Sequence, residues 1–102
     1  MSLLYQGGGM RKTHQLKIRP EFFQAVINGT KKAEFRRADR DFAVGDLLCL
    51  NEYGACVYDP KKVGFTGAFV YVLVTHITDL SEWAPGYVML SIQRRQMGEL
   101  CG

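Results

Sequence analysis

The chain has 102 residues, enough for one domain of ordinary size, and its 47% hydrophobic and 23% charged content argues against a disordered chain. No apolar run approaches the roughly 20 residues of a membrane-spanning helix, so no membrane association is expected. Residues 11–40 hold nine Lys or Arg against three acids, and residues 41–102 hold four against seven, which leaves an anionic partner such as nucleic acid and a merely solvated basic face as alternatives.

Residues 1–9, MSLLYQGGG, have neither the basic start nor the apolar run of a secretory signal. We interpret them as a flexible leader, with Met10 as an alternative beginning, and residues 10–102 as a single domain. The three cysteines, Cys49, Cys56 and Cys101, lack the spacing of a zinc site and are expected to be reduced, as in a cytoplasmic protein.

The first expected elements are a strand and a short helix. Residues 14–18 alternate polar and apolar side chains, as in a half-buried strand. Pro20 stands where a first helical position would be and Gly29 lies just past the end, so a helix over residues 20–28 is predicted. A helix this short is unstable alone, so it must dock its apolar stripe, which consists of Phe22, Phe23, Val26 and Ile27.

The rest of the chain reads mainly as β-structure. The run over residues 66–77 is nearly continuous in apolar residues, which is typical of a central strand. One or two short helices among five or six strands favour a mainly β (α+β) fold, a small curled sheet or open barrel with a helix over one mouth. Strands are predicted over residues 32–37, 47–53, 66–77 and 87–92, and a loop centred on residues 83–86. Residues 51–67 are predicted to form a hairpin loop, or two short arms joined by residues 59–62.

Charge is concentrated in residues 28–46, NGTKKAEFRRADRDFAVGD. In an extended conformation Ala33 and Phe35 share one face, which is expected to anchor the strand. Glu34 and Arg36 share the other face, about 6.5–7 Å apart along the strand, where they can pair with each other or converge on one ligand. The alternative is an exposed strand face with alternating charges, whose ion pairs contribute about 0–1 kcal/mol.

Residues 29–36, GTKKAEFR, match the GxKxxExR signature of the ASCH (activating signal cointegrator homology) domains, which belong to the PUA-like group. The order of the surrounding blocks is also similar to that of small ASCH-related proteins from bacteria and phages. The resemblance spans about residues 10–92, nearly the whole domain. Its blocks are HQLKI at residues 14–18, the short helix, ADRDF at 38–42, VGD at 44–46, TG at 66–67 and GYVMLSI at 86–92.

The resemblance implies a PUA-like open β-barrel in which the motif lies in a cleft beside the first helix, a place proposed to bind RNA or a modified nucleoside. Carried over by position, the ligand-binding residues are Lys31, Glu34 and Arg36, and Arg37 and Arg40 are expected to extend the positive rim. Lys and Arg neutralise phosphate, Arg donates a planar fork, and Glu accepts from an exocyclic amine. The predicted function is therefore recognition of RNA or a nucleotide in a charged cleft.

An enzymatic function is the alternative. Some ASCH-type proteins are amidohydrolases that act on acylated cytidine with a Lys, a Thr three residues later and a Glu on a later strand, and they resemble this chain at Gly29 and Lys31. Glu34 occupies the Thr position, so the chain departs from that trio and the catalytic candidates are Lys31 and Glu34. A third interpretation is a phage accessory protein whose barrel binds a host protein.

The remaining polar candidates have structural interpretations. His76, in an apolar strand, is predicted to be a structural histidine rather than a catalytic base. Asp39 and Asp41 are expected to organise a turn, and neither a metal nor a cofactor is predicted. Four aromatic residues are expected to pack in the core or at its rim, with a base-stacking surface as the alternative: Tyr53, Tyr71, Trp83 and Tyr87.

Overall fold

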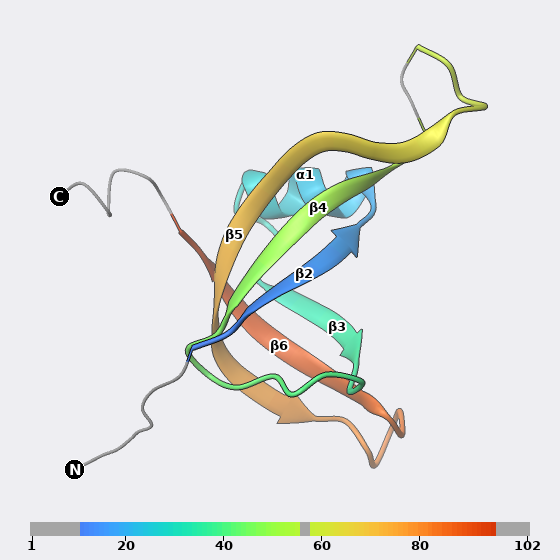
Figure 1. Cartoon of the computed structure of the whole chain (residues 1–102). Helices are drawn as coiled ribbons and strands as arrows, with labels where there is room; N and C mark the ends of the chain where they lie inside the picture. The colour runs from blue at the N-terminus through green and yellow to red at the C-terminus, as the bar shows by residue number, and fades with distance from the viewer. Residues whose placement is uncertain (1–10, 56–57, 96–102) are drawn as a thin grey trace, which may run out of the picture.

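A single curled β-sheet organises the computed structural model, which describes residues 11–55 and 58–95. The elements in chain order are β2 (Thr13–Ile18), α1 (Pro20–Ile27), β3 (Ala33–Arg37), β4 (Leu47–Ala55), β5 (Val63–Asp79) and β6 (Tyr87–Arg94). Five strands in the order β2-β4-β5-β6-β3 form the sheet, and α1 lies behind β4 in the view of Figure 1. The predicted fold class, a mainly β open barrel with a short helix, is confirmed.

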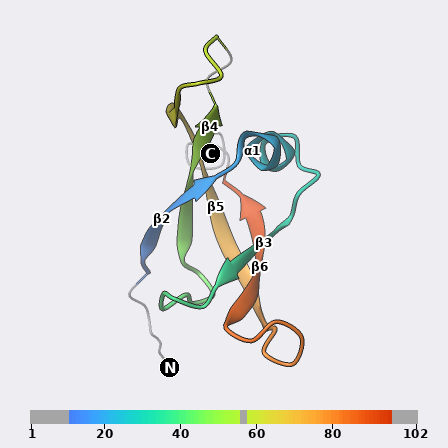
Figure 2. The ribbon, with the colours of Figure 1, turned by 90° about the vertical axis from the view of Figure 1, so that its right-hand side faces the viewer.

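The curl of the sheet turns its two edge strands, β2 and β3, toward each other. β2 runs parallel to β4, and the other strand pairs are antiparallel. The long strand β5 joins the two halves, because its first part pairs with β4 and its last part with β6. Figure 2 shows β2 and β4 on one side of the molecule and β3 and β6 on the other. Among the described strands, each edge strand pairs with one other, so its outer edge keeps carbonyl and amide groups for other contacts.

The apolar core lies between the concave side of the sheet and α1. The helix begins at Pro20, as predicted, and ends one residue before the predicted end; Gly29 follows with a φ of 84°, which glycine adopts without strain. Phe23 and Val26 of the predicted stripe are buried, whereas Phe22 is 45% exposed. The strands supply the rest of the buried cluster: Leu16, Ile18, Leu48, Leu50, Val70, Val72, Val74, Leu90 and Ile92.

The predicted strands are all present, and most of them are longer than predicted. β4 continues to Ala55, β5 runs from Val63 to Asp79, and β6 continues to Arg94. Of the two predictions for residues 51–67, the two arms joined by residues 59–62 are confirmed, because β4 and β5 stay paired as far as Ala55 and Val63. The loop centred on residues 83–86 is a turn in which the N–H of Trp83 donates to the carbonyl of Leu80 at 2.9 Å.

Several sequence predictions concern residues outside the described ranges. The leader of residues 1–9 lies there, and so do Cys56 and Cys101; Cys49 is a buried free cysteine on β4. The described ranges contain no helix long and apolar enough to cross a membrane, since α1 has eight residues.

A close approach between α1 and β4 predicts a strong effect of one added methyl group. A Cβ at Gly54 would lie 2.7 Å from Cγ and Cδ of Pro20. Gly54→Ala is therefore expected to lower the free energy of unfolding by about 1–3 kcal/mol, measured by urea denaturation followed by circular dichroism. Gly64 faces Gly54 on β5, and a Cβ there meets nothing within 4 Å, so Gly64→Ala is the matched control. Equal stability of the two variants would contradict this contact.

Candidate functional site

The carboxylate of Glu34, at the centre of the predicted site, is buried between two cations. Glu34 lies on β3 opposite Leu90, and 4% of its side chain is exposed. Lys31 Nζ lies 2.7 Å from Oε2, and Arg36 Nε donates to Oε1 at 2.9 Å. The three signature residues therefore come together. Because both carboxylate oxygens have cationic partners, Glu34 orients the two cations.

The expectation that Ala33 and Phe35 would anchor β3 is wrong for Phe35. The strand turns its other face inward, since Glu34 is 3% exposed and Phe35 is 52% exposed. On the outer side the Phe35 ring stacks on Tyr87 of β6, with centroids 4.9 Å apart and an interplanar angle of 11°. A carboxylate can occupy an interior position when it is paired and hydrogen-bonded, and the two neighbouring cations satisfy that condition.

Two arginines bridge the gap between β2 and the β3 side of the barrel. Arg36 Nη2 donates to the backbone carbonyl of Lys17 at 2.7 Å, and Arg40 Nη1 donates to that of Gln15 at 3.1 Å. Gln15 and Lys17 are two residues apart on β2, so their carbonyls point to the same edge of that strand. Both arginines therefore reach the free edge of β2. They occupy hydrogen-bonding positions that another strand would otherwise fill. We call this region, formed by Gln15, Lys17, Arg36 and Arg40, the seam.

A buried His14–Asp46 pair anchors the segment between β3 and β4 to β2. His14 Nε2 lies 2.8 Å from Asp46 Oδ2, and Asp46 also accepts hydrogen bonds from the backbone N–H groups of Lys12 at 3.1 Å and Ala43 at 3.0 Å. Burial pushes the pKa of Asp46 upward, but the hydrogen bonds and the interaction with His14 outweigh it and hold the pKa below its ordinary value. The His14 ring also packs edge-on against Phe42, with centroids 4.8 Å apart. This anchor holds in place the segment that carries the second arginine of the seam.

A hollow of about 350 Å³ opens at the seam, and we call it the seam hollow. Three of its lining residues are the cationic Lys17, Arg36 and Arg40. Asn51 Nδ2 donates to Gln15 Oε1 at 3.0 Å, which orients two amide groups beside the cations. The lining includes neither Asp nor Glu, and consists of Gln15, Leu16, Lys17, Arg36, Arg40, Asn51 and Phe65.

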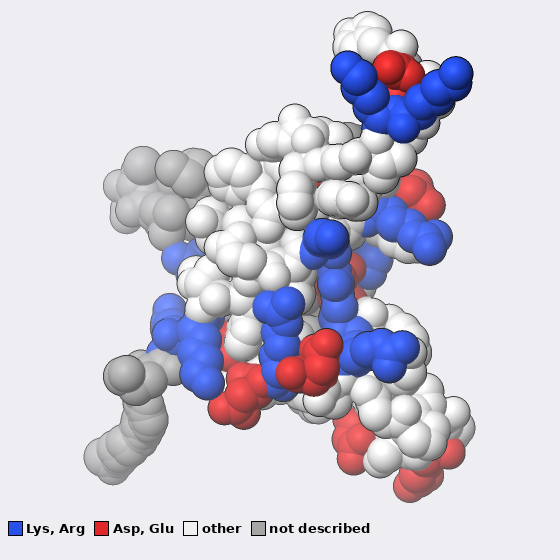
Figure 3. Space-filling model, turned by 45° about the vertical axis from the view of Figure 1, so that its right-hand side comes forward, with Lys and Arg blue, Asp and Glu red and all other residues white. Residues whose placement is uncertain are grey.

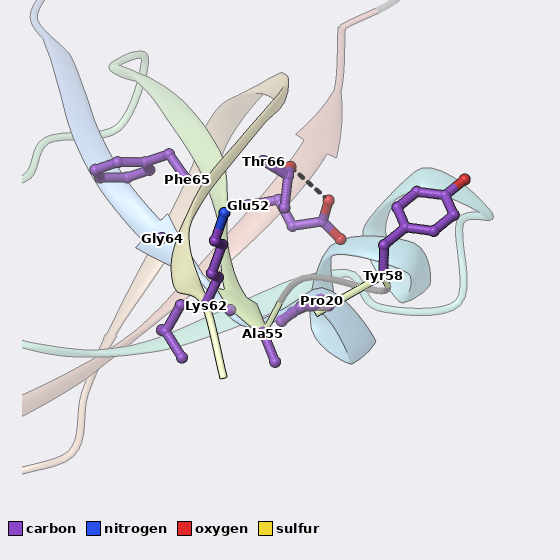
Figure 4. A pocket seen from close by; sticks show the side chains of 10 residues that line it. Pro20, Glu52, Ala55, Tyr58, Lys62, Gly64, Phe65 and Thr66 are labelled. Atoms are coloured by element: carbon purple, nitrogen blue, oxygen red, sulfur yellow. Dashed lines mark hydrogen bonds between the residues drawn. The ribbon is translucent and has the colours of Figure 1, made fainter. Parts of the chain in front are cut away.

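Two further hollows lie along the β4–β5 hairpin. One, of about 320 Å³, adjoins the seam hollow because Gln15, Asn51 and Phe65 line both. The other, of about 520 Å³, lies toward the end of the hairpin, where Thr66 Oγ1 donates to Glu52 Oε1 at 2.8 Å (Figure 4). None of the predicted site residues lines this one, which is formed by Pro20, Glu52, Gly54, Ala55, Tyr58, Lys62, Val63, Gly64, Phe65 and Thr66.

The two catalytic candidates, Lys31 and Glu34, lie outside all three hollows. Lys31 donates to the carbonyl of Ala33, and its Nζ lies 5.8 Å from the ring centroid of Phe22 on α1. Its ammonium group is thus committed to an ion pair and a backbone hydrogen bond. In this geometry Lys31 and Glu34 hold each other beside Arg36.

The three predicted arginines separate into two groups. Arg36 and Arg40 line the seam hollow. Arg37 lies on the outer face of β3, where its guanidinium carbon is 5.3 Å from the ring centroid of Tyr87. Arg37 therefore extends the positive charge of the outer surface without reaching the hollow.

Sequence reasoning missed part of the site. The alternation in HQLKI could have shown that Gln15 and Lys17 share the face opposite the buried one. No comparable signal pointed to Asn51 and Phe65, because their place depends on which strands are neighbours. The buried pair was also missed, although both of its members lie in blocks of the ASCH resemblance.

The remaining candidates lie away from the seam hollow. His76 is exposed, with its Nδ1 3.4 Å from Thr78 Oγ1, and Trp83 is 75% exposed in its turn. Asp41 pairs with Lys12 at 3.1 Å. Within residues 11–55 and 58–95, no three His, Cys, Asp or Glu side chains gather in a way that could hold a metal ion.

Comparison with known proteins relates nearly the whole described fold to one family. Residues 13–92, from β2 into β6, match the family described as Domain of unknown function (DUF3850). A protein of Escherichia phage P2, described as an uncharacterized 12.9 kDa protein in the GpA 3′ region, is 40% identical over 91 residues. That match covers 89% of this chain and 74% of the phage protein. The chain therefore belongs to the DUF3850 family.

Proposed function

We propose that the protein binds RNA and that the seam hollow holds a phosphate and the base next to it. The observation that carries the proposal is the lining of the hollow, where three cations stand beside two amides and an aromatic ring, without a carboxylate. Cations neutralise phosphate, amides donate and accept at base edges, and a ring provides a stacking surface. A modified nucleotide, which also carries a phosphate and a base, is a smaller ligand that suits the same lining.

The arginines of the seam are already ordered for such a ligand. Arg36 is held by Glu34 and the Lys17 carbonyl, and Arg40 by the Gln15 carbonyl. A guanidinium has five N–H donors, so these hydrogen bonds leave donors on both groups for a phosphate or base. Ordered side chains lose less conformational entropy on binding.

Two sequence features support the same class of ligand. The motif in residues 29–36 resembles the ASCH signature, and the cleft at that motif is proposed to bind RNA or a modified nucleoside. The cysteine content predicts a cytoplasmic protein, a location in which RNA is accessible.

Arg40→Gln is expected to weaken the binding of labelled single-stranded RNA and to reduce its salt dependence. Glutamine keeps an N–H donor for the Gln15 carbonyl but removes the charge. If Arg40 neutralises one phosphate, the slope of log K against log salt should fall by about 0.7. Affinity at low salt should fall about tenfold, which corresponds to about 1.4 kcal/mol. Fluorescence anisotropy at several salt concentrations measures both quantities.

Arg37→Gln is the matched control, because it removes the same charge from the outer face of β3. It is expected to leave the salt slope unchanged. Equal effects of the two substitutions would show that net charge alone drives binding and would contradict a site at the seam. A wild-type protein without affinity for RNA at low salt would contradict the proposed function altogether.

A further inference from the structure

The outer face of β4 and β5 presents aromatic rings to solvent. Phe65, Phe69 and Tyr71 are 62%, 56% and 41% exposed. The rings meet edge to face, with centroids 4.9 Å apart for Tyr53 and Phe65 and 5.8 Å apart for Phe69 and Tyr71. An antiparallel sheet with one face on the core usually places polar side chains on the other. We call Tyr53, Phe65, Phe69 and Tyr71 the aromatic face.

The aromatic face takes no part in docking the helix. Along β5 the side chains alternate, with Val70 and Val72 buried on the core side and Phe69 and Tyr71 exposed. The helix α1 lies on the core side of the same strands (Figures 1 and 2). Exposed apolar patches with a polar border mark binding surfaces, so these rings indicate a binding surface on the outer side of the sheet.

Cations connect the aromatic face to the seam. Lys17 Nζ lies 4.4 Å from the ring centroid of Tyr53 and 5.7 Å from that of Phe65. Figure 3 shows Lys and Arg side chains beside a broad surface without charged groups. The positions on the outer side of β2, of β4 and of the part of β5 paired with β4 include no Asp or Glu among the described residues, and Cys49 is the buried one among them. They are Thr13, Gln15, Lys17, Leu47, Cys49, Asn51, Tyr53, Ala55, Val63, Phe65, Phe69, Tyr71 and Leu73. This surface complements a polyanion that carries flat apolar rings.

A bulge in β5 opens space between the exposed rings. Asn51 faces Phe69 and Tyr53 faces Phe65, so one residue of β4 is opposite three residues of β5. Gly67 lies within this bulge with a φ of 93°. The hollow of about 320 Å³ lies over Gly67 and Ala68, beside the Phe65 ring. The aromatic face therefore offers both ring surfaces and an unfilled space next to them.

A second copy of the chain is a poorer occupant of this face. In a two-fold contact the same patch meets itself, so cations of the two copies would meet across the interface. Because the outward positions of the described strands supply no carboxylate, these strands offer nothing that would offset that repulsion.

We propose that the aromatic face stacks the unpaired bases of a single-stranded RNA whose phosphates follow the seam. This inference rests on the proposed function and narrows it, because it names the form of RNA that is bound. A duplex hides its base faces, and a mononucleotide has a single base for the four rings. The ligand is therefore a segment of several unpaired nucleotides.

Phe69→Leu tests the proposal, since it removes a ring but keeps an apolar side chain at an exposed position. The probe is a labelled oligouridylate of about 10 nucleotides, within the site sizes of small barrel domains, titrated into the full chain. The substitution is expected to weaken binding about 5- to 100-fold, with an unchanged salt slope because no charge is removed. Phe35→Leu, which removes another half-exposed ring on the outer face of β3, is the matched control and should leave the affinity unchanged.

The outcomes separate this inference from the proposed function. If Arg40→Gln weakens binding but Phe69→Leu does not, the aromatic face is overturned and the seam site stands. If the wild-type protein does not bind the oligouridylate at low salt, both this inference and the proposed function are contradicted. Equal competition by a fully paired RNA duplex overturns single-strand selection, and a dimer that Phe69→Leu dissociates assigns the face to a second copy. An oligothymidylate bound as tightly as the oligouridylate supports stacking and overturns the preference for RNA.

Discussion

Replacing Arg36 by methionine is expected to lower the free energy of unfolding by about 2–4 kcal/mol, as measured by urea denaturation. Methionine retains the apolar stem of the side chain but leaves the buried carboxylate of Glu34 with Lys31 as its remaining cationic partner. It also removes the hydrogen bond to the Lys17 carbonyl at the edge of β2. The effect should be large because a buried charge that loses a partner cannot recover that interaction from water.

Removing the buried charge of Glu34 should lower the free energy of unfolding less than removing its partner Arg36. Glu34→Leu places an apolar side chain opposite Leu90, and Lys31 and Arg36, each with a side chain 23% exposed, can turn toward water. It is expected to change the free energy of unfolding by about 1 kcal/mol or less. The double variant with methionine at Arg36 should then be more stable than Arg36→Met alone. If the double variant is no more stable than Arg36→Met alone, the unpaired carboxylate of Glu34 is not what destabilises the Arg36→Met protein.

This expected asymmetry follows from the division of roles at the seam. Glu34 is buried and orients Arg36, while Arg36 reaches both the free edge of β2 and the seam hollow. Of the three motif residues that the sequence predicts as ligand contacts, Arg36 lines the seam hollow, and Lys31 and Glu34 form an ion pair beside it. A buried support that holds an arginine in place reduces the entropy lost on binding.

Local patterns predicted most of the fold. Pro20 is the first residue of α1, where its fixed φ suits the start of a helix. Gly29 follows the end of α1 with a positive φ. The strands were found from alternation, but alternation identifies two faces without saying which one is buried. For β3 the more apolar face, with Phe35, looked like the interior, and the pairing of Glu34 with two cations reversed that choice.

The seam could not be predicted because its contacts join distant segments. Arg36 and Lys17 are 19 residues apart, Arg40 and Gln15 are 25 apart, and Asn51 and Gln15 are 36 apart. Each contact requires the strand order, in which β2 and β3 are the two edges. The aromatic face has the same origin, since Tyr53 meets Phe65 through strand pairing. Short-range sequence patterns carry no information of this kind.

Asp46→Ala is expected to lower the free energy of unfolding at neutral pH by about 2–4 kcal/mol. The substitution removes the acceptor for the backbone N–H groups of Lys12 and Ala43 and the partner of the buried His14 ring. Asp41→Ala is the control, because it removes the same charge from an exposed ion pair with Lys12 and should cost about 1 kcal/mol or less. Urea denaturation of the three proteins measures the difference, and similar stabilities of the two variants would contradict the anchoring role of Asp46.

The pH dependence of this difference tests the charge of Asp46 separately. Its pKa is lowered in the folded protein, because hydrogen bonds and the interaction with His14 outweigh the effect of burial. The unfolded chain therefore binds a proton more readily than the folded one, so the stability due to ionisation is complete above the ordinary Asp pKa of about 3.9. It is lost as the pH falls through the lower folded pKa. The stability difference between the wild type and Asp46→Asn, which keeps the shape without the charge, should accordingly shrink as the pH falls below about 4. A difference that stays constant over that range would show that hydrogen-bond geometry alone, without ionisation, holds the segment carrying Arg40 against β2.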